Sequence, residues 1–383
     1  MKNKVNYNFA IVLLTYPFTT HISFASYFFL ILSGLICFFE IFKFFLNKNI
    51  FYKNSIIFFL LSICLFVHGY LNYSKYSSFI LLCYILINSL FINIFFNNSN
   101  PKKVLFTIDF IYKISFLIAF LFMFLDIFYP EYQSLIGYRA GTNYPFLGSL
   151  NIFRAHGLFD EPSELSIFLG SLLAIRIYIC RVLNKLSPKN EYFNPNKYII
   201  SYVFIVLITV STSAFIYFLA LLAILNFKNL SKLYISKNLI IVISILIPSL
   251  LFYFYPILVK SFNFFSSTST RSIFLPLESL DLPIGQGIGY LSIKGIYLPN
   301  LFFRLIIEQG IFISIIFYLF VLRRLFSPIY PITILFILFS ISSSDISQPI
   351  FSLFISIPIL NLNKLKFLYF EDNQNIKGIF NYG

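Results

Sequence analysis

Charged side chains are scarce in this sequence. Of its 383 residues, 11% are Asp, Glu, Lys or Arg, whereas 59% are hydrophobic and 21% are aromatic. A soluble domain needs more polar surface than this to cover its core, so the composition excludes an ordinary soluble protein. Long apolar runs that end at Lys, Asn or Pro are typical instead of helices that cross a lipid bilayer.

Acidic residues are especially few, with 14 Asp and Glu against 28 Lys and Arg, a formal net charge of +14. In a soluble protein this excess would indicate nucleic acid. Here the basic residues lie in short segments between apolar runs, where they orient transmembrane helices. Membrane lipid is therefore an expected partner, and nucleic acid is not.

Cysteine is rare as well, and its positions exclude a disulfide framework. The four cysteines lie inside or at the inner end of apolar runs: Cys37, Cys64, Cys83 and Cys180. Neither a metal site nor a cofactor is expected. The apolar run at the amino terminus lacks a small-residue cleavage site, so we expect it to remain as the first helix.

The apolar runs predict an all-α fold, a polytopic membrane bundle of about 12 transmembrane helices that forms one domain over 1–383. The predicted spans are 8–22, 25–43, 54–71, 78–96, 104–128, 164–182, 198–211, 213–227, 238–257, 299–322, 328–343 and 348–362. Polar residues interrupt 198–227, which favours two short spans over the alternative of one long tilted helix. With both termini in the cytoplasm, including a tail of about 363–383, most basic residues between spans lie on the cytoplasmic side.

Two of the predicted outer segments are long, about 129–163 and about 258–298. Loops of this length are usually functional or disordered. The first contains Arg139 and Arg154, and the second contains Arg271 and a glycine-rich stretch. We therefore expect the chemistry of this protein at the outer, non-cytoplasmic face of the membrane.

The densest group of reactive side chains precedes the span 164–182. It reads Arg-Ala-His-Gly-Leu-Phe-Asp-Glu-Pro-Ser-Glu from Arg154 to Glu164. This group predicts an active or binding site, with Glu161 and His156 as candidates for proton transfer. A structural alternative stands beside it. With Ser163 as N-cap, the carboxylates lie at a helix amino terminus, where the dipole favours them by a few tenths to about 1 kcal/mol, and His156 is an interfacial histidine.

Guanidinium groups are placed where they could bind phosphate. Arg139, Arg154 and Arg271 all lie on the predicted outer side, and a guanidinium stays charged and matches two phosphate oxygens at once. Three such groups predict binding of a lipid-linked phosphate or pyrophosphate. The alternative is contact with ordinary phospholipid headgroups.

Two further patterns predict substrate binding. Gly285, Gly287 and Gly289 alternate with other residues in a loop without the strand that a nucleotide-binding fold requires. They favour a loop that re-enters the membrane surface and brings backbone amides near a ligand, or else a flexible turn. Arg304 and Glu308 are four residues apart on one predicted helix face, as are Asp109 and Lys113, and charges at such depth usually face a cavity or a neighbouring helix.

The segment Arg154-Ala-His-Gly-Leu-Phe-Asp-Glu-Pro-Ser resembles the Arg-x-x-Gly-Leu-Phe-x-Glu-Pro segment of the bacterial O-antigen polymerase family. Three further segments resemble that family in the same order: Thr209 to Ser213, Arg271 through Gly289, and Asn300 through Gly310. The resemblance covers about the second 60% of the chain. The first four predicted spans depend on hydropathy alone.

The resemblance implies a metal-independent glycosyltransferase of the inner membrane that joins oligosaccharide units carried on undecaprenyl pyrophosphate. It implies that Arg154 and Arg271 are essential, and it suggests a chain-length regulator protein as a partner. O-antigen ligases are similar in topology but often carry a histidine in the second long loop, which 258–298 lacks. The alternatives are such a ligase, or a flippase or other transporter, although the unlike halves of the chain do not favour a transporter.

Overall fold

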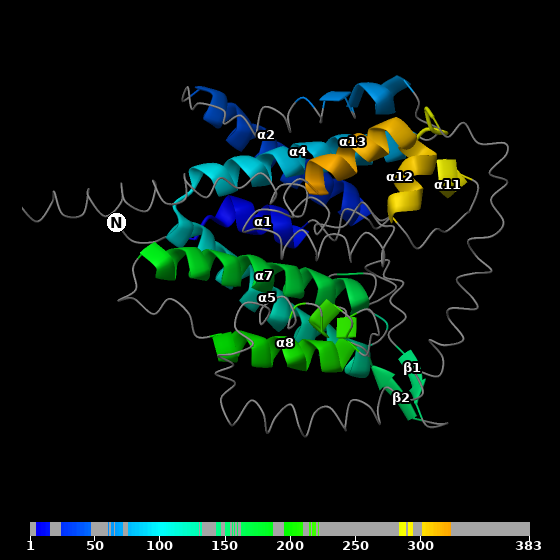
Figure 1. The fold of residues 1–383 in the computed structure, drawn as a ribbon. Helices are drawn as coiled ribbons and strands as arrows, with labels where there is room; N and C mark the ends of the chain where they lie inside the picture. The colour runs from blue at the N-terminus through cyan, green and yellow to red at the C-terminus, as the bar shows by residue number, and fades with distance from the viewer. Residues whose placement is uncertain are drawn as a thin grey trace, which may run out of the picture.

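The computed structural model of this chain consists mainly of helices (Figure 1). It describes residues 5–15, 24–46, 60, 63–64, 66–71, 76–129, 131, 143–146, 150–153, 155, 157, 159, 162–186, 195–209, 214–215, 217–219, 221, 283–288, 290–293 and 301–322. Its elements are α1 (Tyr7–Thr15), α2 (Phe24–Leu46), α4 (Tyr76–Asn98), α5 (Pro101–Phe128), β1 (Asn143–Phe146), β2 (Leu150–Phe153), α7 (Pro162–Leu186), α8 (Pro195–Thr209), α11 (Tyr290–Ile293), α12 (Leu301–Gln309) and α13 (Ile311–Leu322). Within the described part of the chain, the predicted helical character is confirmed.

Three helices begin at a proline, namely α5, α7 and α8. The side chain of Asn100 caps α5 by accepting a hydrogen bond from the amide of Lys102 at 2.8 Å, with Pro101 as the first helical residue. Helix α7 begins at Pro162, so the prediction of Ser163 as its N-cap is wrong. Proline takes the first position because its φ angle suits the helix and it has no amide hydrogen to leave unpaired there.

Helix α7 is the central helix of the described structure, and Figure 1 shows it between α4 on one side and α8 on the other. All of its residues from Leu165 to Cys180 are buried, as expected for a helix surrounded by neighbours. Gly170 lets α8 approach closely, since a Cβ atom there would lie 2.8 Å from Cζ of Tyr202. The Tyr202 hydroxyl then donates to the carbonyl of Ser166 at 3.0 Å.

Helix α1 joins α2, α4 and α5. Its Phe9 is fully buried and stacks on Phe95 of α4 with ring centroids 4.0 Å apart. Between α2 and α4, the Cys37 thiol donates to the Asn88 side-chain oxygen at 3.0 Å. None of the four cysteines, all of which are described, forms a disulfide.

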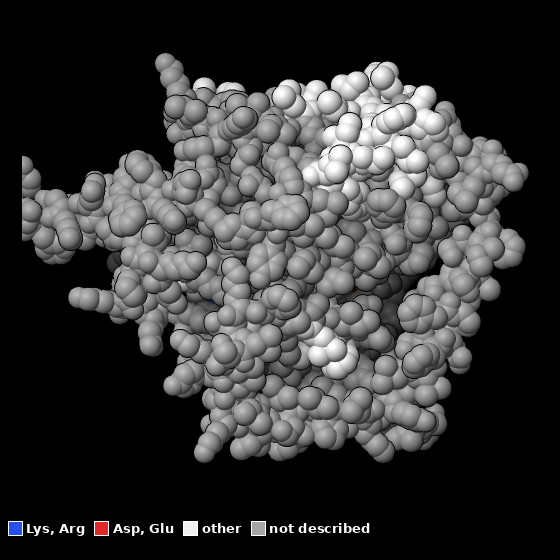
Figure 2. Space-filling model, in the orientation of Figure 1, with Lys and Arg blue, Asp and Glu red and all other residues white. Residues whose placement is uncertain are grey.

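Large apolar side chains also cover the outside of several helices. The exposed ones on three helices are Phe28, Ile31, Leu35, Phe38, Phe39, Phe42 and Leu46 on α2, Phe106, Leu117, Leu121, Phe124, Ile127 and Phe128 on α5, and Phe312, Ile315, Ile316 and Leu319 on α13. In Figure 2, the white patch at the upper right consists of described residues other than Lys, Arg, Asp and Glu. Among the described residues, α5 is the one helix long and apolar enough to cross a membrane, by length and composition. Outer faces of this kind suit contact with lipid.

The predicted span 299–322 is wrong as a single helix. The structure divides it into α12 and α13 at Gly310, whose φ angle is 86°. A residue in this left-handed conformation ends a helix, and here the Gly310 amide closes the last turn by donating to the carbonyl of Ile306 at 3.0 Å.

The all-α prediction also omits a β-hairpin in the first long segment predicted to lie on the outer side, about 129–163. Strands β1 and β2 pair antiparallel, with Asn143 opposite Phe153 and Phe146 opposite Leu150. Figure 1 shows this hairpin at the same end of the bundle as α11 and α12. Helix α11 lies within the second long predicted outer segment, about 258–298, and α12 follows that segment. The described parts of the two segments are therefore on one side of the molecule.

Five other predicted spans correspond to helices of the structure, namely α2, α4, α5, α7 and α8. Helix α1 covers the start of the first. The described residues within 54–71 and 213–227 are helical. The predicted spans 238–257, 328–343 and 348–362 and the tail of about 363–383 lie outside the described residues. The number of spans therefore stays a prediction.

Candidate functional site

Four of the predicted substrate-binding residues meet in one place. Gly285 and Gly287 lie in a loop that docks on α12, the helix that carries Arg304 and Glu308. The other predicted site residues lie outside the described part of the chain: Arg139, Arg154, His156, Glu161, Arg271 and Gly289. We call the meeting place the glycine-loop junction and define it as residues 283–288, His68, Gly69, Arg304, Glu308, Gln309 and Gly310.

The loop caps the end of α12. The last carbonyl groups of a helix have no partner within the helix, and leaving them unpaired in a buried place is costly. Three of them are satisfied here: Ile306 by the Gly310 amide at 3.0 Å, Ile307 by the Gln286 amide at 2.7 Å, and Glu308 by the Gly287 amide at 3.1 Å. Two amides of the loop thus bind the helix rather than face a ligand. Substrate binding by Gly285 and Gly287 stays a prediction.

Glycine is required on both sides of this contact. Gly285 and Gly310 have φ angles of 90° and 86°, a region that other residues rarely adopt. A Cβ atom at Gly285 would lie 2.8 Å from the carbonyl oxygen of Glu308, and one at Gly310 would lie 2.5 Å from that of Pro283. The two backbones approach so closely that neither position has room for a Cβ atom.

A histidine from a distant segment bonds to both halves of the junction. Nε2 of His68 lies 2.8 Å from the carbonyl oxygen of Ile284 in the loop. Its Nδ1 lies 3.0 Å from the side-chain amide oxygen of Gln309, the last residue of α12. These partners are 216 and 241 residues away in the sequence.

Ile288 anchors the loop to α4. Its side chain is 1% exposed and packs against Leu82 and Leu86 of that helix. Gly69, next to His68, makes room for it. A Cβ atom at Gly69 would lie 2.7 Å from Cδ1 of Ile288. The segment 66–71, α4, the loop and α12 thus form one packed unit.

The predicted pair of Arg304 and Glu308 is confirmed, with Nε of Arg304 3.3 Å from Oε2 of Glu308. The carboxylate is 3% exposed and the guanidinium 23%. A carboxylate near a helix carboxyl terminus opposes the helix dipole, and the ion pair offsets this.

No protein-family model, curated protein or solved structure matches this chain. What the junction does is therefore inferred from its own residues.

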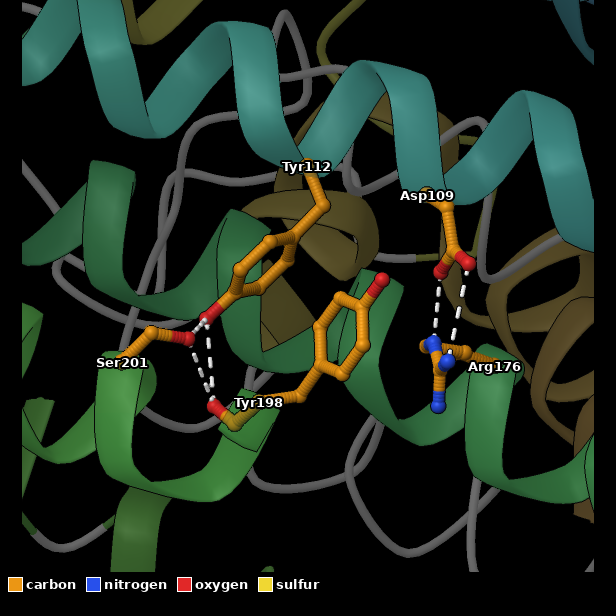
Figure 3. A network of polar contacts seen from close by, with 5 residues as sticks. All are labelled: Asp109, Tyr112, Arg176, Tyr198 and Ser201. Carbon is orange, nitrogen blue, oxygen red and sulfur yellow. Dashed lines mark hydrogen bonds and ion pairs between the residues drawn. The ribbon is translucent and has the colours of Figure 1, made fainter. Parts of the chain in front are cut away.

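A second polar group lies between α5, α7 and α8 (Figure 3). Nε of Arg176 donates to one carboxylate oxygen of Asp109 at 2.5 Å, and Nη2 lies 3.5 Å from the other. Pairing of Asp109 with Lys113 on its own helix was the prediction, but the structure joins Asp109 to Arg176 of α7, and the Lys113 side chain is exposed. An ion pair this well buried ties the two helices together.

Aromatic rings complete this group. The Arg176 guanidinium lies over the Tyr198 ring, 3.7 Å from its centroid, a favourable cation–π arrangement. Figure 3 shows the Tyr198 ring between Arg176 and Tyr112. The Tyr112 hydroxyl lies 3.0 Å from the Ser201 hydroxyl, and Ser201 donates to the Tyr198 carbonyl at 2.9 Å. Because every described member contacts another member, we assign this group a structural role.

Three residues of the segment Arg154 to Glu164 are buried anchors, namely Ala155, Gly157 and Phe159. The amide of Ala155 donates to the carbonyl of Ile208 near the end of α8 at 2.9 Å. Gly157 has a φ angle of 60°, and the Phe159 ring packs on Phe168 of α7 with centroids 5.2 Å apart. The backbone of the motif is thus held against the bundle at the end that also carries the hairpin.

His68 and Gln309 are the junction residues that sequence reasoning missed. The available signal was weak: His68 with Gly69 interrupts an apolar run, and Gln309 lies between Glu308 and Gly310. Nothing in these local patterns indicates that the two side chains meet. Only the fold brings them together.

Replacing Gly310 with alanine is expected to release the loop. The new Cβ atom meets the backbone of Pro283 and Ile284, and alanine resists the left-handed conformation. Together these effects cost the docked state about 2 kcal/mol, roughly a thirtyfold rise in hydrogen exchange at the amides of Gln286 and Gly287. Hydrogen exchange with mass spectrometry on the full chain in lipid nanodiscs measures this.

Gly34→Ala is the matched control. No atom lies within 4 Å of a Cβ built at Gly34, which is inside α2. There alanine should be neutral or stabilise by about 0.5–1 kcal/mol, because it favours the helix. Unchanged exchange at 286 and 287 in Gly310→Ala would show that the loop does not depend on this close approach.

Proposed function

We propose that this chain is a polytopic protein of the bacterial inner membrane with about 12 transmembrane helices and both termini in the cytoplasm. It polymerises oligosaccharide units linked to undecaprenyl pyrophosphate at the periplasmic face. The apolar outer faces of α2, α5 and α13 support a membrane location. The segment Arg154 to Ser163, which resembles the O-antigen polymerases, supports the reaction.

The observation that carries the proposal is the placement of the two outer segments. The hairpin ends at Phe153, immediately before Arg154. The buried residues Ala155, Gly157 and Phe159 follow Arg154 in the same segment. The glycine loop belongs to the segment with Arg271. Figure 1 shows the hairpin and the helices around the glycine loop at one end of the bundle. Two guanidinium groups carried on these segments can therefore serve one lipid-linked pyrophosphate.

The proposed mechanism needs neither metal nor nucleotide, because pyrophosphate on a lipid is already a good leaving group. A hydroxyl oxygen of the incoming unit attacks the anomeric carbon of the growing chain. The bond from that carbon to the pyrophosphate oxygen breaks, and its electron pair leaves with the pyrophosphate. Arg154 and Arg271 stabilise the charge that develops there. Glu161, or alternatively His156, takes the hydroxyl proton.

Reconstitution tests the proposal directly. The purified chain in proteoliposomes, supplied with synthetic lipid-linked repeat units alone, is expected to form a ladder of polymers and to release undecaprenyl pyrophosphate. Gel separation of the labelled glycans measures the ladder. Movement of the units across the bilayer without polymer would indicate a flippase. Transfer of glycan only after a lipid A–core acceptor is added would indicate a ligase.

A further inference from the structure

Lys113 lies within an exposed apolar face of α5. Six exposed side chains share this face, which we call the α5 stripe: Phe106, Lys113, Leu117, Leu121, Phe124 and Phe128. At about 3.6 residues per turn, all six lie within about a quarter of the helix circumference. A single ammonium group thus interrupts a row of large apolar side chains.

The position of Lys113 along α5 is unfavourable for a charge. Counted from Pro101, it is the thirteenth of 28 residues, and α5 is the described helix that is long and apolar enough to cross a membrane. With α5 centred in a hydrocarbon core about 30 Å thick, the two boundaries lie about 13 and 17 Å from this residue. A lysine side chain reaches about 6 Å, too short to bring the ammonium group to either boundary. A charge at this depth is costly and usually faces a partner or a pathway.

The described part of the chain offers Lys113 no carboxylate. Asp109, one turn earlier, is bound by Arg176 through both of its carboxylate oxygens. Asp126 is 1% exposed and lies about 20 Å further along the helix. Among the described residues, Lys113 takes part in no ion pair. Its charge is therefore not neutralised by any helix that packs on α5 in the described structure.

The stripe also lacks the small residues that let membrane helices approach each other closely. Such contacts use Gly, Ala, Ser or Thr, which bring two backbones together. The stripe instead has Phe and Leu, with Leu117 66% and Phe128 60% exposed. Packing on these side chains alone does not select one helix over another. The ammonium group does, because a carboxylate buried against it in lipid has no water to compete for it.

We propose that the α5 stripe is the docking surface for a transmembrane helix of a partner protein, and that this helix carries an Asp or Glu near its midpoint. Charge complementarity identifies the partner. Its carboxylate pairs with Lys113, and its apolar side chains pack on the Phe and Leu residues to either side. This inference rests on the membrane location in the proposed function and is independent of the polymerisation reaction.

A designed probe tests the pairing. The chain has no tryptophan, so Leu117→Trp, one turn beyond Lys113, places a single fluorescent donor on the stripe. Full-length protein in proteoliposomes is titrated with synthetic apolar transmembrane peptides that carry a dansyl acceptor and either Asp or Leu at the midpoint. Energy transfer should show about tenfold tighter association of the Asp peptide. The preference should disappear in Lys113→Leu.

Charge reversal separates pairing from packing. Lys113→Glu should prefer a peptide with a central Lys over the Asp peptide by a similar factor, because the apolar side chains of the stripe are unchanged. Lys103→Leu is the matched control. It removes a lysine ten residues earlier on the same helix and should keep the wild-type preference.

Three results would overturn the proposal. The first is equal association of the Asp and Leu peptides with the wild type, and the second is a preference that survives in Lys113→Leu. The third is energy transfer to dansyl-labelled copies of the chain without peptide, which would identify a second copy as the occupant.

Lipids brominated near the bilayer centre check the depth of α5 separately. They should quench the fluorescence of Leu117→Trp, and equally so when Lys113→Leu is added, which shows that the variant inserts normally. Absence of quenching would refute the membrane location of α5 and the docking surface with it. Polymer formation in the same proteoliposomes reports on the reaction alone, so failure of the reaction and failure of the docking are distinguishable.

Discussion

Arg271→Ala is expected to stop the glycan at a single repeat unit. In the proposed mechanism, the guanidinium stabilises negative charge on the departing pyrophosphate, and loss of one such electrostatic contact lowers kcat by about 10² to 10³. At that rate the supply of new units outpaces their joining. The ladder of glycan lengths on a gel, from cells or from proteoliposomes, measures the effect.

Two further variants make this result specific. Arg271→Lys keeps the charge but loses the two-pronged match to phosphate oxygens, so its rate should lie between those of the wild type and the alanine variant. Arg181→Ala removes a guanidinium near the carboxyl-terminal end of α7, the end away from the Arg154 segment, and should leave the ladder unchanged. Normal long chains from Arg271→Ala would remove Arg271 from the mechanism.

Asp109→Ala is expected to lower the free energy of unfolding by about 3–5 kcal/mol. The variant leaves the Arg176 guanidinium, whose side chain is 6% exposed, without its carboxylate partner. The stacking on Tyr198 remains but does not neutralise the charge. Thermal unfolding of the purified protein in nanodiscs, followed by circular dichroism, measures the loss.

The double variant Asp109→Leu with Arg176→Met distinguishes the pair from simple packing. With both charges replaced by apolar groups of similar size, nothing is left unpaired, and most of the stability should return. Lys113→Ala, one turn along α5 and exposed, should change the stability by no more than about 0.5 kcal/mol. If Asp109→Ala were as stable as the wild type, the ion pair would not hold α5 to α7.

The helices were predictable wherever an apolar run was long and uninterrupted. Helices α2, α4, α5, α7 and α8 lie close to their predicted ranges because helix formation in such a run satisfies every backbone group locally. The division at Gly310 was not predicted. A glycine inside an apolar run is compatible with a continuous helix, and the left-handed turn is stabilised here by a loop from elsewhere in the chain.

In the polar groups too, a contact between residues close in the sequence was predictable, and a contact between distant residues was not. The ion pair of Arg304 with Glu308 followed from the sequence, since residues four apart on a helix are neighbours whatever surrounds them. The partner of Asp109 is 67 residues away, and no local rule selects it over Lys113. Burial favours Arg176, whose guanidinium can be desolvated between two helices only beside a carboxylate.

By itself, the sequence predicted that this chain is mainly helical and that most of its candidate reactive side chains lie in two long segments between apolar runs, because composition and periodicity are properties of neighbours along the chain. Only the tertiary structure decided that His68 meets Ile284 and Gln309, and that glycines from three segments of the chain meet in one junction. Contacts between residues more than 200 positions apart depend on how helices pack. That packing is a compromise among all side chains at once.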